Sequence, residues 1–153
     1  MTFRVIALDP EPFRPLFRLS DAELAARGVT RLAAEPNWPC RVSLDEAEPG
    51  EPVLLLNYEH QPADTPYRSR HAIFVTDRAE PASSPPGVVP PALAVRPLSV
   101  RAFDAEHMMI DADLTPGAEA AALFDRLLED PRTTYLQAHY ARRGCYAARV
   151  ERA

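Results

Sequence analysis

The sequence predicts an α+β fold in which residues 1–153 form a single globular domain, with a mainly antiparallel sheet, two or so helices and a C-terminal β-hairpin. Three observations predict this class. The length of 153 residues suits one domain with one core. Most patterned segments have strand character, and the two helical patterns are isolated from each other. This order differs from the regular alternation of strand and helix in a βαβ repeat.

In the N-terminal half, the sequence predicts one short helix and three segments with strand character. The first of these segments precedes the helix and the other two follow it. Ser20 and Glu23 match a capping box, and Gly28 is placed to end the helix after about two turns. The proline-rich segment before this helix is expected to be extended or irregular, because proline lacks a backbone donor and restricts its predecessor. The strand patterns cover residues 3–8, 40–44 and 52–58, the last as a well-buried central strand.

In the C-terminal half, strand character resumes at residues 71–77, so this segment and 52–58 are expected to be neighbours across a twelve-residue loop. Thr115 is the expected N-cap of a helix over residues 116–129, whose apolar stripe includes Phe124 as a core anchor. Gly144 is placed for a left-handed turn. The extended segments are 93–104, 107–114 and the two hairpin arms, 133–141 and 145–151.

The charge and the apolar pattern exclude several partners. A net charge of −5 and no basic stripe argue against a nucleic-acid surface. No apolar run approaches the roughly 20 residues that a membrane span needs, so no membrane partner is expected. The N-terminal apolar run is too short for a signal peptide, which predicts a cytoplasmic location. In that reducing compartment, Cys40 and Cys145 are expected to be free thiols.

All 17 basic residues are arginines, and the absence of lysine removes whole mechanisms. Schiff-base chemistry, covalent pyridoxal phosphate and the lysine-containing phosphate-binding loop are excluded. Only five glycines are present, and no dinucleotide-binding fingerprint occurs. The histidines and cysteines show none of the close pairings typical of metal ligands. No cofactor and no metal site are therefore expected.

Three stretches resemble one known family. They are "PCRVSLDEAEPGEPVLLLNYEH", "PYRSRHAIFV" and "HYARRGCYAARVER", and together they are similar to the bacterial family catalogued as domain of unknown function 1203. The resemblance implies a single-domain protein. The family has no assigned activity, so no residue role is carried over. Relatives commonly have Gly-Pro before "IFV", where this chain has His71 and Ala72, which makes His71 the weaker candidate in its loop.

The segment 57–71 is the leading candidate for a binding site. If its flanking strands pair, its ends lie close together, and Asn57, His60, Tyr67 and Arg68 could converge on one pocket. A guanidinium binds carboxylate or phosphate in a bidentate manner, and histidine supplies a switchable proton. We expect a small anionic ligand here, anchored by Arg68. In the alternative interpretation, Arg68 pairs with nearby acids and the tyrosines cover a sheet edge.

Two other classes of function stay open. Cys145 with His139 could form the nucleophile and base of a cysteine-dependent hydrolase or transferase, with Arg142 and Arg143 favouring the thiolate. A buried cysteine that packs as a small hydrophobe is the simpler interpretation. The third possibility is a non-catalytic interaction module that contacts a partner through the proline-rich segment 79–91.

Overall fold

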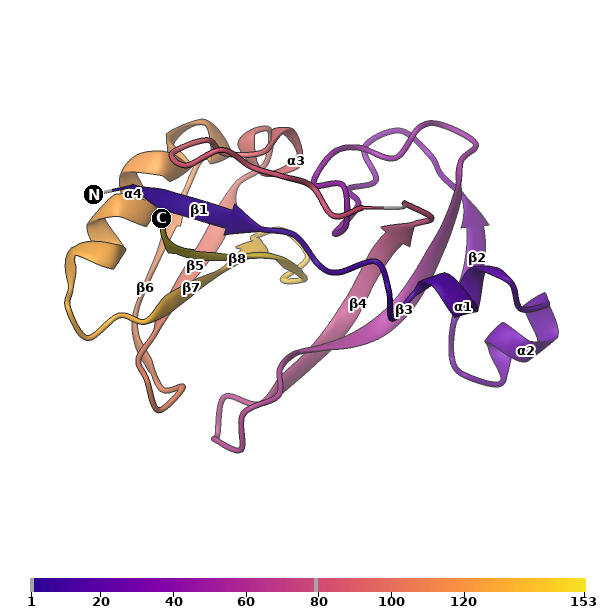
Figure 1. The fold of residues 1–153 in the computed structure, drawn as a ribbon, viewed down its shortest axis with the longest axis horizontal. Helices are drawn as coiled ribbons and strands as arrows, with labels where there is room; N and C mark the ends of the chain where they lie inside the picture. The colour runs from indigo at the N-terminus through magenta and orange to yellow at the C-terminus, as the bar shows by residue number, and fades with distance from the viewer. Residues whose placement is uncertain (1, 79) are drawn as a thin grey trace.

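The computed structural model describes residues 2–78 and 80–153, which form two antiparallel sheets with strand orders β1-β8-β7-β5-β6 and β2-β3-β4. The two sheets lie side by side, and α4 covers one face of the larger sheet (Figure 1). The predicted α+β class is confirmed. The strands are β1 (Phe3–Ile6), β2 (Thr30–Ala33), β3 (Pro52–Gln61), β4 (Ser69–Thr76), β5 (Leu98–Phe103), β6 (Met109–Thr115), β7 (Tyr135–Tyr140) and β8 (Tyr146–Arg152). The helices are α1 (Arg14–Phe17), α2 (Asp21–Ala25), α3 (Pro91–Ala94) and α4 (Ala120–Glu129), with a 3-10 turn η1 (Gly117–Glu119) before α4.

The larger sheet has its core under α4. Phe124 is fully buried, and its ring meets Phe3 of β1 edge-on at 5.2 Å, so the predicted core anchor is confirmed. The predicted cap is wrong, because α4 begins at Ala120 after η1 and has no side-chain cap. The hydroxyl of Thr115 instead donates to the carbonyl of Pro116 at 3.1 Å.

The smaller sheet has β3 at its centre, as the apolar run at 52–58 predicts. β3 and β4 pair in register from Val53 opposite Thr76 to Tyr58 opposite His71, which confirms that the two segments are neighbours. The connection is shorter than predicted, because β3 continues to Gln61 and pairs again with Ser69. The first and last residues of the predicted loop therefore lie in strands, where successive side chains point to alternate faces.

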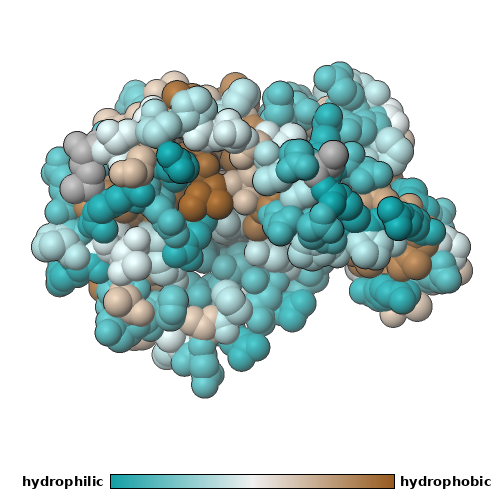
Figure 2. Space-filling view, viewed as in Figure 1, coloured by the Kyte–Doolittle hydropathy of each residue, from teal (hydrophilic) through white to brown (hydrophobic). Residues whose placement is uncertain are grey.

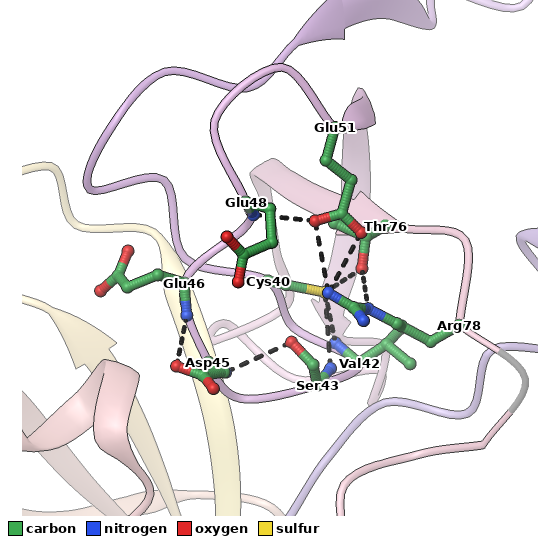
Figure 3. A network of polar contacts seen from close by, with 9 residues as sticks. All are labelled: Cys40, Val42, Ser43, Asp45, Glu46, Glu48, Glu51, Thr76 and Arg78. Carbon is green, nitrogen blue, oxygen red and sulfur yellow. Dashed lines mark hydrogen bonds and ion pairs between the residues drawn. The ribbon is translucent and has the colours of Figure 1, made fainter.

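The segment Cys40–Leu44, predicted as a strand, is a turn. The amide of Leu44 donates to the carbonyl of Cys40 at 3.0 Å, and Leu44 has a φ of 54°. The Cys40 sulfur lies 3.4 Å from the amide nitrogens of Val42 and Ser43 and 3.0 Å from Thr76 Oγ1 (Figure 3). Alternating polarity was misleading here, because a turn folded into the core buries the same side chains as a strand.

Two short helices test the local signals of the N-terminal half. The capping box of α2 is confirmed, because Ser20 Oγ accepts from the amide of Glu23 and Glu23 accepts from the amide of Ser20. Helix α1 was missed, because its prolines were interpreted as extended chain. Proline is tolerated in the first turn of a helix, where its missing donor breaks no helical hydrogen bond.

The turn of the C-terminal hairpin confirms the prediction for Gly144, whose φ is 77°. Apart from its chain neighbours, no heavy atom lies within 4 Å of where its Cβ would stand, so a substitution acts through the backbone. We expect Gly144→Val to lower the free energy of unfolding by about 1 kcal/mol or more, because a branched side chain disfavours positive φ. Urea unfolding measures the change. Equal stability of wild type and variant would contradict the strain argument.

Candidate functional site

The residues of the predicted 57–71 site are spread over the two faces of β3 and the connection between β3 and β4. Asn57 and Glu59 alternate along β3 with Tyr58 and His60. Arg68 Nε lies 3.2 Å from Glu59 Oε2, and Arg70 Nε donates to Asn57 Oδ1 at 2.5 Å. The Arg68 side chain is 55% exposed. Arg68, the expected anion anchor, is thus already paired with a carboxylate at the surface.

Tyr67 and His60 turn toward the larger sheet instead. The Tyr67 ring meets Phe103 of β5 edge-on at 6.2 Å. His60 Nδ1 lies 2.9 Å from Gln137 Oε1, and its ring stacks on Tyr146 of β8 at 5.6 Å. These contacts join the two sheets. They give His60 and Tyr67 structural partners away from Arg68.

His139 stands in the same inter-sheet cluster as His60, with ring centroids 4.9 Å apart. Its Nδ1 lies 3.1 Å from the carbonyl oxygen of Gly144, and its Nε2 lies 3.2 Å from Gln137 Oε1. Burial, followed by the charge of Arg101, lowers the pKa of His139 to about 3. Both ring nitrogens therefore face partners other than Cys145. Within residues 2–78 and 80–153, no three His, Cys, Asp or Glu side chains are grouped to hold a metal ion.

Cys145 lines a different feature, a cavity of about 430 Å³ that we call the arginine pocket. It lies where the turn around Arg41, strand β4, the segment between α3 and β5, and the β7–β8 turn meet. The lining residues are Asn37, Trp38, Pro39, Arg41, Phe74, Val95, Arg96, Pro97, Tyr140, Arg142, Arg143 and Cys145. Four of these are arginines, and none is acidic.

Arg41 is the most unusual residue of the arginine pocket, because its side chain is buried with only 1% exposed. Its Nε donates to the carbonyl of Tyr146 and its Nη1 to the carbonyl of Pro39, both at 2.8 Å. Its Nη2 makes no hydrogen bond to the described residues. The guanidinium also forms no ion pair with any carboxylate among them. Burying a charge without a counter-ion is costly.

The Tyr140 ring connects Arg41 to Arg96. The guanidinium carbons of the two arginines lie 5.0 and 5.3 Å from its centroid. Arg96 is neutralised by Glu46, to which it donates at 2.5 and 2.9 Å. The Tyr140 hydroxyl is buried and lacks a hydrogen-bond partner in the described part of the chain. Burial raises the pKa of Tyr140 to about 12, so the phenol keeps its proton at neutral pH and can donate it to an acceptor.

The rest of the arginine pocket combines an aromatic wall with two exposed cations. Trp38 and Phe74 stack at 4.5 Å with their planes 6° apart. Arg142 and Arg143 are exposed in the β7–β8 turn and form no ion pair with the described residues. The pocket thus offers uncompensated positive charge beside a flat apolar surface, a combination that suits a small organic anion.

Sequence reasoning named Arg142 and Arg143 only as neighbours of a thiol, and it missed Arg41, Arg96 and Tyr140. One local signal was present for Arg41, which stands between the apolar residues Cys40 and Val42. A charged residue inside such a segment either points to solvent or is buried for a reason. Its position among apolar residues does not decide between these alternatives.

The fold and the pocket define a small α+β domain with a cationic cavity beside the junction of its two sheets. The chain belongs to the family described as "Protein of unknown function (DUF1203)", whose model matches residues 37–152. The match includes every residue that lines the arginine pocket. No curated protein and no solved structure matches the chain. No helix in the described residues is long and apolar enough to cross a membrane.

Proposed function

We propose that this domain binds a small organic anion, a carboxylate or a phosphate, in the arginine pocket. The observation that carries the proposal is the buried Arg41, which has a free Nη2 and no carboxylate partner among the described residues. A bound anion would supply the missing counter-charge, and a guanidinium fits carboxylate and phosphate well. The cavity of about 430 Å³ is within the usual range for small-molecule sites.

The proposal keeps the ligand class predicted from the sequence and moves the site away from the 57–71 segment. At that segment, Arg68 shares a carboxylate with Arg70, because Glu59 Oε2 lies 3.2 Å from one and 3.8 Å from the other. A ligand there would compete with Glu59. In the arginine pocket, Arg41, Arg142 and Arg143 have no such competitor in the described structure.

Benzoate and benzamide provide a matched pair of probes, since both can stack on Trp38 and Phe74 while only benzoate is charged. We expect calorimetry to show tighter binding of benzoate. Arg143→Ala should weaken benzoate binding by about 1 kcal/mol or more. Arg126→Ala is the control, because Arg126 of α4 pairs with Asp113 of β6 and does not line the pocket. Equal affinities for the two probes would refute the proposal.

Tyr140→Phe separates binding from stability. Removing a buried hydroxyl that lacks a partner should leave the free energy of unfolding unchanged or raise it by about 1 kcal/mol. The same change should weaken benzoate binding by about 0.5 to 1.5 kcal/mol, because the ligand loses a hydrogen-bond donor. Urea unfolding and calorimetry measure the two effects. A less stable variant with unchanged benzoate affinity would mean that the hydroxyl serves the fold.

Arg68→Ala decides between the two candidate sites. The exposed pair with Glu59 should contribute less than about 1 kcal/mol to stability. If benzoate binds in the arginine pocket, its affinity should not change in this variant. A loss of about 1.5 to 3 kcal/mol in affinity would return the site to the 57–71 segment.

Two further sequence predictions complete the proposal. We place the protein in a bacterial cytoplasm, where structural disulfides are rare, in keeping with the free thiols of Cys40 and Cys145 in the structure. The alternative function, a non-catalytic interaction module, would contact its partner through segment 79–91. The first residue of this segment, Ala79, lies outside the described residues. Pairing of Ser83 with Ile6 and a hydrogen bond from Gly87 to Phe3 tie this segment to β1. On the face shown in Figure 2, apolar residues form small separate patches on a largely hydrophilic surface.

A further inference from the structure

Cys145 places a thiol in the wall of the arginine pocket. The residue is 8% exposed and stands directly before β8, and its carbonyl accepts from the amide of Tyr140 at 2.9 Å. It lines the cavity together with Arg96 and Tyr140. The Tyr140 hydroxyl of the same pocket is buried without a partner in the described residues, and Arg41 Nη2 forms no hydrogen bond with them. Arg41, Tyr140 and Cys145 line the same cavity, so an anion bound there shares that cavity with the thiol.

Cys40 provides an internal comparison. Its sulfur is fully buried in the smaller sheet's core and contacts Thr76 Oγ1 at 3.0 Å (Figure 3). Two backbone amides also point at it, at 3.4 Å. Cys40 lines neither of the molecule's two described cavities. The two thiols of one chain therefore differ in access to a cationic cavity.

We infer that Cys145 is a site of mixed-disulfide formation with small disulfides that carry carboxylates. This inference rests on the proposed function, because the arginines must first attract the anion. The Cys145 thiol loses its proton to solvent, and the thiolate attacks one sulfur of the disulfide. A new S–S bond joins Cys145 to half of the reagent as the original S–S bond breaks. The other half leaves as a thiolate, so the disulfide is the oxidant and no other reactant is needed.

The arrangement of His139 makes this step different from catalysis by a cysteine–histidine pair. The ring nitrogens of His139 face Gly144 and Gln137, so its imidazole is not placed to take the Cys145 proton. Successive side chains on β7 point to opposite faces of the sheet, so His139 and Tyr140 face in opposite directions. Cys145 packs in the core cluster that contains Tyr140. Charge in the pocket, rather than a general base, selects the reagent.

Three disulfides of similar size test the inference: 3,3′-dithiodipropionate, 2-hydroxyethyl disulfide and cystamine, which are anionic, neutral and cationic. Intact-mass spectrometry follows their addition to the native protein, and each rate is divided by that of the urea-unfolded chain. This division removes intrinsic differences among the reagents. We expect the dianion to be favoured over the neutral reagent by about tenfold or more, and cystamine to be disfavoured. The net charge of −5 acts against this order, so the preference would report the pocket.

Variants locate the reaction. Cys145→Ser should abolish the addition, whereas Cys40→Ser should preserve it. Arg143→Ala should lower the anion preference by about threefold or more, and Arg126→Ala should leave it unchanged. Equal normalised rates for the three reagents, or addition at Cys40, would overturn the inference. Calorimetry of Cys145→Ser with benzoate keeps the two proposals separate. If this variant binds benzoate while the wild type shows no preference for the anionic disulfide, the thiol reaction is refuted and the anion site is supported.

Discussion

Replacing Phe124 with alanine should lower the free energy of unfolding by about 3 to 5 kcal/mol. The ring is fully buried between α4 and the larger sheet and packs edge-on against Phe3. The truncation removes the burial of the ring and leaves a cavity that rigid neighbours on β1 cannot fill. Such a loss is a large part of the stability of a domain of this size. Urea unfolding followed by circular dichroism measures it.

Leu114→Ala is the matched control for this prediction. Leu114 lies on β6, an edge strand of the same sheet, and is 70% exposed. Its truncation should change the free energy of unfolding by about 0.5 kcal/mol or less. If the two variants lost similar stability, the helical stripe would not be the centre of the core. A Phe124→Ala variant as stable as wild type would have the same meaning.

Local signals in the sequence predicted those elements whose structure is decided by nearby residues. The capping box at Ser20 and the positive φ of Gly144 depend on backbone chemistry within a few residues, and both are confirmed. The apolar run of β3 is long enough to require burial on both faces. The turn at Cys40–Leu44 was missed, because its conformation depends on contacts with Thr76, 36 residues away from Cys40.

The candidate site was less predictable, since it depends on which charges pair after folding. Arg68 loses its free charge to Glu59, nine residues earlier, because β3 extends three residues beyond its predicted end. Arg41 keeps its charge unpaired, because the chain encloses it with carbonyl groups from Pro39 and Tyr146. The residue type is identical in both cases. Only the tertiary arrangement separates an arginine that pairs with a carboxylate from one that does not.

The inter-sheet histidine cluster should make the protein unstable in acid. Burial lowers the pKa of His60 as well as that of His139, for which it reaches about 3. In the unfolded chain a histidine titrates near 6.5, so between pH 6.5 and 3 the unfolded chain binds more protons at this position than the folded protein. The stabilising contribution is fully present above pH 6.5 and is lost as the pH falls toward 3.

For His139 alone, the loss from pH 7 to pH 3 should approach about 4 to 5 kcal/mol, at about 1.4 kcal/mol for each tenfold difference in proton affinity. The ring is fully buried and its neighbours include Arg101, so the charged form gains little solvation and meets a like charge. Urea unfolding at a series of pH values should show the free energy of unfolding falling as the pH falls, with a slope that His139→Gln reduces. This variant is also expected to be less stable than the wild type at pH 7. Nuclear magnetic resonance of the His139 ring should show the neutral form until the protein unfolds. Protonation of this ring near pH 6.5 in the folded protein, or an unchanged slope in His139→Gln, would show that another group causes the acid sensitivity.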